Sequence, residues 1–254
     1  MSPAARIGRE AALYFSAQEF LTRLPVPGWT GYEPGRLARA SRYFPIVGLV
    51  VGAVGGGVWL LAGAVLPAPL AAGLALGATI LVTGALHEDG FADCCDGLGG
   101  GRTRERALEI MRDSRIGAYG AVGLLFSVGL RWAALASLAP AAGFAALLIA
   151  AASGRAAMAL ILAAGRYARD DGAARDAAGG AGPGEAIFAA AVALAVGLSA
   201  GATGVFAALL ALVAGRLWLA VLHQRLGGYT GDGLGAAEQI GEIVVLISLA
   251  GLLA

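Results

Sequence analysis

Seven long apolar segments, joined alternately by very short links and by longer polar stretches, are the feature of this sequence that most restricts its fold. Because an α-helix needs roughly 20 apolar residues to cross the hydrocarbon core of a bilayer, they predict an all-α polytopic membrane protein. We expect about seven transmembrane helices, within a range of six to eight. The fifth segment is short and the seventh begins with two carboxylates, so these two fit least well. The segments are 43–66, 68–86, 117–139, 141–164, 185–200, 202–222 and 238–254.

Composition supports this class and excludes others. Hydrophobic residues make up 58% of the 254 residues and charged residues only 14%, whereas charged residues are about 25% of an ordinary soluble domain. A formal net charge of +1 argues against a basic nucleic-acid-binding protein, and the hydrophobic content argues against a disordered chain. The 41 glycines lie among Ala, Leu and Val, where small residues let membrane helices approach closely.

The arginines predict the orientation. All 18 basic residues are Arg, and those outside the apolar segments lie before the first segment and in alternate links. Cytoplasmic loops carry an excess of positive charge, so we expect a cytoplasmic N-terminus, an outside C-terminus and a cytoplasmic location for every long polar segment. The arginines concerned are Arg6, Arg9, Arg23, Arg36, Arg39 and Arg42, then Arg102, Arg104, Arg106, Arg112 and Arg115, then Arg166, Arg169 and Arg175, and finally Arg225.

The chain is predicted to form one integral-membrane domain over residues 1–254. Its polar parts are a cytoplasmic and interfacial segment at 1–42, an acidic motif followed by an amphipathic helix at 87–116, and a second polar motif at 223–242. Residues 11–24 are typical of an amphipathic helix that lies on the membrane surface, because the charged residues Arg9, Glu10 and Glu19 stand beside large apolar side chains, namely Leu13, Tyr14, Phe15, Phe20 and Leu21.

The acidic motif is the most informative stretch. Asp89, Asp93 and Asp96 follow an i, i+4, i+7 spacing that places all three on one face of a helix. Carboxylates gathered in this way repel one another, and a divalent cation would hold them together. Oxygen ligands of this kind suit Mg²⁺, which commonly combines one or two carboxylates with substrate phosphates. Glu88 is a further metal ligand, an outer partner or a solvated residue, and the bland alternative for the motif is a solvated first helical turn.

Arg115 follows the acidic motif and is predicted to contact phosphate. Arginine matches phosphate oxygens with two parallel hydrogen bonds, and Asp113, Ser114 and Arg115 immediately precede the glycines that begin the third apolar segment. Helix N-termini of that kind bind anions. Arg102, Arg104 and Arg106 are interpreted as positive charges that flank the membrane on its cytoplasmic side.

A second polar motif contains Thr230, Gly231 and Asp232 within a glycine-rich run at 227–235, followed by Glu238 and Glu242. Glycines interrupt helices, so we expect a tight loop at the membrane surface here. A second acidic group at the same depth as the first predicts two cations, or one cation and a base, as phosphoryl transfer commonly requires.

Three arginines lie inside apolar segments. A charge at the centre of a membrane helix is costly, about 2.5–3.5 kcal/mol on insertion scales, so each is a candidate site residue. Arg131 and Arg155 are predicted to face inward and pair with an anion or a carboxylate. Arg216 lies near a cytoplasmic end, where reaching the interface is an equal alternative.

Taken together, the motifs resemble the cobalamin synthase family, the adenosylcobinamide-GDP ribazoletransferases, nearly end to end. The matching stretches are Phe-Leu-Thr-Arg-Leu-Pro at 20–25, Phe-Pro-Ile-Val-Gly at 44–48, His-Glu-Asp-Gly-Phe-Ala-Asp at 87–93 with Asp-Gly at 96–97, Leu-Glu-Ile-Met-Arg-Asp-Ser-Arg-Ile-Gly at 108–117, and Tyr-Thr-Gly-Asp-Gly-Leu-Gly-Ala at 229–236 with Glu242. Glu238 belongs to this pattern less clearly than Glu242 does.

The resemblance implies an Mg²⁺-dependent transferase of the cytoplasmic (inner) membrane, with its active site facing the cytoplasm. Adenosylcobinamide-GDP and α-ribazole, or its 5′-phosphate, would give adenosylcobalamin or its 5′-phosphate and GMP. It leaves open a homo-oligomer or an association with other enzymes of cobalamin assembly, and no nucleic-acid partner is implied. The implied catalytic residues are Asp89, Asp93, Asp232 and Glu242; the metal ligands are Asp89, Asp93, Asp96, Glu88 and Asp232; the substrate- and phosphate-binding residues are Arg115, Ser114, Asp113, Arg155, Arg131, Thr230 and Gly231.

Two other readings compete with this one. CDP-alcohol phosphotransferases and membrane prenyltransferases also present Asp clusters to Mg²⁺ and a diphosphate, but this chain lacks the Ala-Arg that follows Asp-Gly in the former and a second Asp-rich motif of the latter. A transporter also carries inward-facing charges, yet the polar motifs here all lie on the predicted cytoplasmic side.

Overall fold

The structure is a computed structural model that describes residues 3–31, 33–169 and 181–253. Every regular element in these ranges is a helix, and the β-type pairing that they contain is an isolated parallel bridge between Tyr167 and Tyr229. The all-α class is therefore confirmed. Arg175, one of the arginines used above to predict the orientation, lies outside the described residues.

Each of the seven predicted apolar segments corresponds to one long helix, although several of these helices begin or end outside the predicted bounds. In chain order these are α3 (Phe44–Gly63), α4 (Ala68–Thr83), α7 (Ala118–Ala136), α8 (Pro140–Ala164), α9 (Pro183–Gly197), α10 (Gly201–Leu226) and α11 (Gly231–Leu253). The polar stretches contribute α1 (Pro3–Leu21), α2 (Arg36–Ala40), α5 (Leu86–Gly100) and α6 (Arg104–Ile110). Short 3₁₀ turns lie at Gly28–Thr30, Ser41–Tyr43 and Leu198–Ala200.

Five helical stretches of the described chain are long and apolar enough to cross a membrane, and there are six if α4 and α5, which meet at a 90° bend, form one broken span. One of the five is the 44-residue stretch Pro183–Leu226, which holds α9 and α10. A straight helix of that length would extend about 66 Å, twice the hydrocarbon thickness. Because α9 instead packs against α10, the stretch folds back near Gly201, whose φ is 65°. The number of spans and the side of the N-terminus stay predictions.

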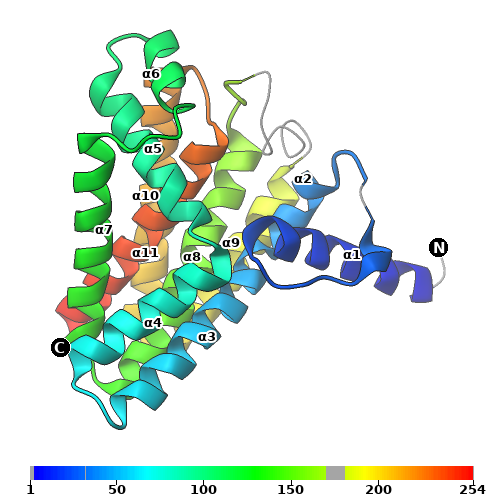
Figure 1. Ribbon diagram of the computed structural model, residues 1–254. Helices are drawn as coiled ribbons and strands as arrows, with labels where there is room; N and C mark the ends of the chain where they lie inside the picture. The colour runs from blue at the N-terminus through cyan, green and yellow to red at the C-terminus, as the bar shows by residue number, and fades with distance from the viewer. Residues whose placement is uncertain (1–2, 32, 170–180, 254) are drawn as a thin grey trace.

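Helix α8 forms the centre of the bundle, with α3, α9, α10 and α11 packed around it (Figure 1). In an apolar stretch of 18 residues within α8, 83% is buried, against 28–50% in the corresponding stretches of the other four candidate spans. Large apolar side chains such as Leu81, Leu125 and Leu217 are exposed on the outer helices, as they are on surfaces that face lipid. The helices thus indicate a multi-pass membrane protein in a lipid bilayer.

Glycines let α3 lie directly against α8. A Cβ atom at Gly52 would stand 2.7 Å from the carbonyl oxygen of Leu147, and one at Gly48 would collide with the carbonyl of Ala151. Two backbones that lie so near each other gain dispersion contacts, which larger side chains would prevent. Gly57 lies on the same helix and has no atom within 4 Å of the corresponding position.

We expect Gly48→Leu to destabilise the protein and Gly57→Leu to leave it unchanged. Forcing side-chain atoms into a packed contact costs about 1–3 kcal/mol, and here the obstacle is backbone, which cannot rotate away. The thermal unfolding midpoint of the purified protein in detergent measures both effects. Equal midpoints for the two variants would show that the α3–α8 contact is looser than described.

Helix α1 extends sideways from the bundle (Figure 1) and confirms the helix predicted at 11–24, although it starts earlier. Leu13, Ala17 and Leu21 are buried on one face, whereas Ile7 is exposed. The end of α1 is tied to α4, because the Arg23 N–H donates a hydrogen bond to the Val82 carbonyl at 2.7 Å. Its location at the membrane surface stays a prediction.

Candidate active site

The acidic motif begins where the chain turns from α4 into α5. Gly84 and Ala85 both take the left-handed conformation, with φ values of 66° and 59°, and their N–H groups bond carbonyls in the last turn of α4. Glycine enters this region freely, but alanine does so at a cost. Helix α5 starts at the next residue and carries Asp89, Asp93 and Asp96, so the predicted helical placement of the motif is confirmed.

The three aspartates of α5 have different surroundings. Asp89 is exposed, Asp93 is half-buried and Asp96 is buried. Asp96 accepts hydrogen bonds from the backbone N–H groups of Gly117 at 2.7 Å and Gly120 at 2.8 Å, so it caps the positive N-terminus of α7. The structure thus gives Asp96 a capping role, and its role as a metal ligand stays a prediction.

Helix α11 brings the second polar motif against α5. A Cβ atom at Gly90 would lie 2.9 Å from the Cα and carbonyl oxygen of Asp232, so the two backbones touch at this point. Asp89, Asp93 and Asp232 are consequently within electrostatic range of one another. The structure thus brings Asp232 of the second motif close to Asp89 and Asp93 of the first.

The prediction that the glycine-rich run forms a loop is wrong for its second half. Helix α11 begins at Gly231, and the Thr230 hydroxyl accepts a hydrogen bond from the Gly233 N–H at 3.0 Å, as an N-terminal cap does. Gly235 lies against α5, since a Cβ there would contact His87 and Gly90. The glycines serve close helix packing here, and Thr230 and Gly231 shape the helix start.

A cavity of about 250 Å³ lies at this helix contact and is bordered by Asp89, Tyr167, Arg169, Asp232 and Gly235, among others. The Arg169 guanidinium is 2.8 Å from a carboxylate oxygen of Asp232. Two backbone hydrogen bonds of 2.8 Å hold the segment that carries Arg169 against Tyr229. The Tyr229 N–H donates to the Arg166 carbonyl, and the Ala168 N–H donates to the Tyr229 carbonyl. Two carboxylates and one guanidinium therefore border the same cavity.

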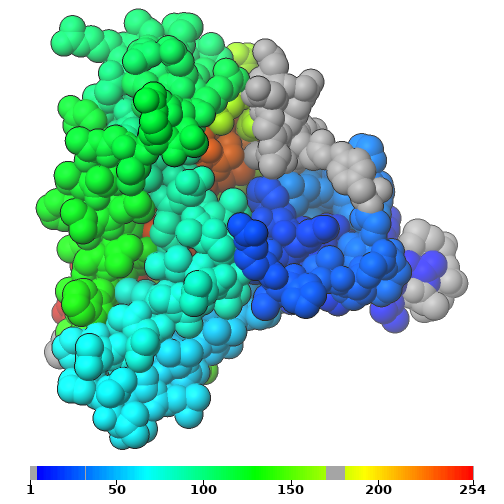
Figure 2. All heavy atoms as spheres, viewed as in Figure 1, coloured from blue at the N-terminus to red at the C-terminus, as the bar shows by residue number. Residues whose placement is uncertain are grey.

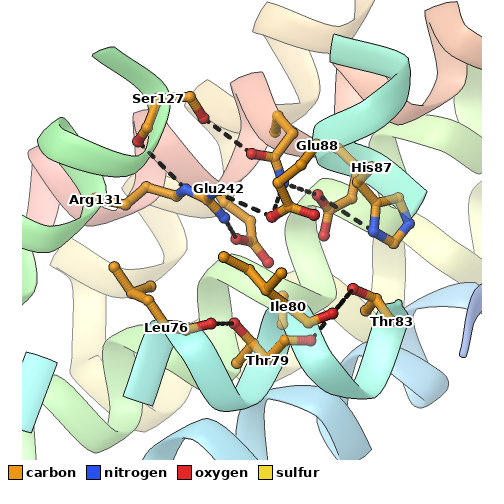
Figure 3. Close-up of polar contacts among 12 residues, drawn as sticks. Leu76, Thr79, Ile80, Thr83, His87, Glu88, Ser127, Arg131 and Glu242 are labelled. Atoms are coloured by element: carbon orange, nitrogen blue, oxygen red, sulfur yellow. Dashed lines mark hydrogen bonds and ion pairs between the residues drawn. The ribbon is translucent and has the colours of Figure 1, made fainter. Parts of the chain in front are cut away.

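Deeper in the bundle, Arg131 of α7 joins α5 to α11 (Figure 3). Its guanidinium bonds Glu242 at 2.8 Å and Glu88 at 3.1 Å. Gln239 donates to Glu88 at 3.1 Å and accepts from the Ser127 hydroxyl at 2.9 Å. All five side chains are buried, so this ion-pair cluster is largely shielded from solvent.

Arg155 of α8 extends the same cluster. Its guanidinium lies 2.7 Å from Glu238 and 3.6 Å from Glu242. Glu238 is also 3.8 Å from the ring of His87. The space left among these side chains is about 10 Å³, which is room for a single water molecule at most.

The buried cluster changes how several predicted residues are understood. An anion or a carboxylate was predicted as the partner of Arg131 and Arg155, and the structure pairs both arginines with carboxylates. The carboxylates of Glu88 and Glu242 are among these partners. None of the four borders the cavity at Asp232. Their expected contacts with phosphate, metal or a substrate proton stay predictions, and a structural role is what their contacts support. Arg216 is exposed.

Asp113, Ser114 and Arg115 form an exposed turn before α7. Arg115 bonds Asp113 at 2.7 Å, and its hydrogen bonds lower the pKa of Asp113 to about 2. The carboxylate therefore stays ionised at neutral pH and neutralises Arg115. A phosphate group would have to replace Asp113 as the partner of this arginine. The turn borders a second hollow, together with Asp96 and Tyr119.

The residues at the α5–α11 contact fit a hard divalent cation. Three carboxylates and one guanidinium meet there, and carboxylate oxygen is the donor that Mg²⁺ prefers. Within the described part of the chain, no three His, Cys, Asp or Glu side chains are arranged to hold a metal by themselves. A Mg²⁺ ion at this contact would therefore need further oxygen ligands, such as those of a substrate phosphate.

The sequence left substrate contact and a plain linker as equal alternatives for the loop at 166–184, and it did not single out Arg169 and Tyr167 as residues of the cavity. They lie in the polar link after the fourth apolar segment, where no spacing relates them to the acidic motif. An available signal was the position of Arg169 only a few residues beyond the end of α8, on the same predicted side as both motifs.

Comparison with known proteins assigns the family. The model of the family described as cobalamin-5-phosphate synthase matches residues 13–250. A protein of Leptothrix cholodnii named adenosylcobinamide-GDP ribazoletransferase is 43% identical, over 96% of each chain. Relatives of the same name from Bradyrhizobium diazoefficiens and Ralstonia nicotianae are 46% and 43% identical, over 91% and 89% of this chain and 90% of their own lengths. No solved structure matches at a significant level. Both polar motifs lie within the matched residues, and the chain therefore belongs to the cobalamin-5-phosphate synthase family.

Proposed function

We propose that this chain is an adenosylcobinamide-GDP ribazoletransferase that performs the nucleotide-loop assembly step of cobalamin biosynthesis. The observation that carries the proposal is the meeting of α5 and α11 at Gly90 and Asp232, which gathers carboxylates from both motifs beside one cavity. The names of the relatives support it, because they match over nearly the whole chain. The acceptor is α-ribazole or its 5′-phosphate.

The proposed reaction is a substitution at phosphorus. A ribose hydroxyl oxygen of α-ribazole forms a bond to the phosphate on the cobinamide side, the bond from that phosphorus to the bridging oxygen of the diphosphate breaks, and GMP leaves with the electron pair. The hydroxyl proton must pass to a base. Asp232 borders the cavity, whereas Glu242 is enclosed by arginines, so Asp232 is the better-placed acceptor.

Asp89 and Asp93 would hold Mg²⁺, with Asp232 as a further ligand or as the base. When bound, Mg²⁺ would neutralise diphosphate charge and orient the phosphate oxygens. Arg169 adds a positive charge at the cavity, where it would bind and orient the anionic substrate. Arg115, with Ser114 and Asp113 beside it, would contact phosphate at the edge of the site after exchanging its carboxylate partner.

We further propose that the protein lies in the cytoplasmic (inner) membrane with this cavity facing the cytoplasm. The arginine-rich links support that orientation. Arg104, at the start of α6, donates a hydrogen bond to the Leu226 carbonyl at the end of α10, and Arg225 donates one to the Leu98 carbonyl of α5, so arginines from two links lie together. Homo-oligomers and complexes with other cobalamin-assembly enzymes are compatible with this placement.

An assay of the purified protein in detergent tests the function. With adenosylcobinamide-GDP, α-ribazole phosphate and Mg²⁺, we expect GMP release at a rate that falls to background when EDTA is added and returns when Mg²⁺ is restored. The reason is that a diphosphate requires charge neutralisation that Arg169 alone does not supply. GMP release that persists in EDTA would remove the metal from the proposal, and release of CMP or inorganic diphosphate from other substrates would point to a different transferase.

A further inference from the structure

A groove leads from the cavity at Asp232 along α1. It consists of three hollows that share lining residues: about 250 Å³ at Asp232, about 570 Å³ beside the α4–α5 bend, and about 460 Å³ between α1 and residues 26–31 and 33–37. Phe20 borders all three, and Asp89 borders the first two. In Figure 2, orange atoms near the start of α11 are visible in a recess beside α5 and above α1. We call this feature the α1 groove.

The walls of the α1 groove combine polar and apolar groups. Glu19 and Glu33 supply carboxylates, Arg23 supplies a guanidinium, and Phe20 and Val26 supply apolar surface. Glu19 and Arg23 are exposed, and Phe20 and Val26 are half-buried. A ligand that suits these walls has an apolar framework with polar groups on its periphery.

Resting on the proposed function, we propose that the α1 groove binds the corrinoid part of adenosylcobinamide-GDP. The corrin ring system is an apolar framework surrounded by amide groups, which both donate and accept hydrogen bonds, and it matches the mixed walls. It has roughly three times as many non-hydrogen atoms as α-ribazole, so it needs a pocket in the upper part of the usual size range. The hollow at Asp232 is too small for it alone, whereas the α1 groove continues from that hollow at Asp89.

This placement orients the reaction. With the corrinoid along α1, the phosphate attached to it reaches the carboxylates at Asp89 first, and the guanosine part lies beyond them. The acceptor riboside must then approach from another side of the cavity at Asp232. Contacts that the corrinoid makes equally in the ground state and in the transition state would lower the KM for this substrate and leave kcat unchanged.

Filling the distal hollow tests the proposal. Ser16 and Val26 both border the hollow of about 460 Å³, on opposite walls, and neither borders the cavity at Asp232. We expect Ser16→Trp and Val26→Trp each to raise the KM for adenosylcobinamide-GDP about tenfold, with the KM for α-ribazole and kcat nearly unchanged. Inhibition by GDP, which lacks the corrinoid, should keep its wild-type constant in both variants.

Ser199→Trp is the matched control. Like Ser16, Ser199 donates its hydroxyl hydrogen bond to a carbonyl of its own helical segment, but it lies in the turn between α9 and α10. Unchanged KM values in both groove variants would overturn the proposal, and so would equal increases for both substrates, which would assign the groove to lipid or to structure. Absence of turnover in the wild-type protein would instead refute the proposed function. If a groove variant is not recovered folded, the other, on the opposite wall, decides.

Discussion

Asp93→Asn is expected to lower turnover about a thousandfold. This is the upper end of the usual cost of removing one electrostatic group that stabilises a transition state. Asp93 and Asp89 are one helical turn apart on α5, and both are within electrostatic range of Asp232. The amide keeps the shape of the side chain but removes the charge that would hold Mg²⁺. GMP release from adenosylcobinamide-GDP at saturating substrate measures the effect.

The variant must also be shown to fold. Because Asp93 is half-buried and lies outside the buried ion-pair cluster, its thermal unfolding midpoint in detergent should match that of the wild type. Glu105→Gln is the control, since Glu105 is a carboxylate on α6 whose side chain is 77% exposed, and we expect normal turnover. Turnover of Asp93→Asn within about threefold of the wild type would remove the carboxylates of α5 from the catalytic role.

The acidic motif was predictable because it is local. The i, i+4, i+7 spacing of Asp89, Asp93 and Asp96 depends only on helical geometry, and α5 is a helix. What the spacing could not reveal is that Asp96 faces the N-terminus of α7. That contact depends on how two helices cross, and the sequence between them carries no signal for the crossing.

The apolar segments were predictable for a similar reason, since hydropathy is a property of each segment. The glycine-rich run was misread because a glycine has two uses that look alike in sequence. It can end a helix, as Gly227 does after α10 with a φ of 74°, or it can let two helices touch, as Gly235 does against α5. Thr230 caps the start of α11, so the glycines before it end α10 and form the link, whereas those after it lie within α11.

The buried arginines were recognised as unusual, but their partners were not. Arg131 and Glu242 are 111 positions apart, and Arg131 and Glu88 are 43 apart. Chemistry alone allows a guanidinium to pair with a carboxylate or with a phosphate, so both partners were open for Arg131 and Arg155. Only the packing of α5, α7, α8 and α11 decides that the carboxylates of this chain are close enough.

Arg155→Met is expected to lower the free energy of unfolding by about 3–5 kcal/mol, the usual cost of removing one partner of a buried ion pair. Arg155 is 1% exposed, and its guanidinium lies 2.7 Å from Glu238. Without it, Glu238 stays buried with no adjacent guanidinium, while Arg131 remains paired with Glu242. The thermal unfolding midpoint in detergent should fall steeply. Arg216→Met removes an exposed arginine from α10 and should have little effect.

A second substitution separates the value of the ion pair from the cost of breaking it. Arg155→Met combined with Glu238→Gln removes both charges and keeps an oxygen that can still accept the bond from Gln239. If the large effect of Arg155→Met comes from an uncompensated charge, the double variant should recover most of the lost stability, since neutral replacement of a buried pair is often nearly neutral. Recovery of folding without recovery of turnover would then assign the cluster a positioning role, because it joins α5 and α11, which carry the acidic residues. A double variant as unstable as Arg155→Met would show that the arginine stabilises the bundle through its packing and its bond to the Ala151 carbonyl rather than through charge.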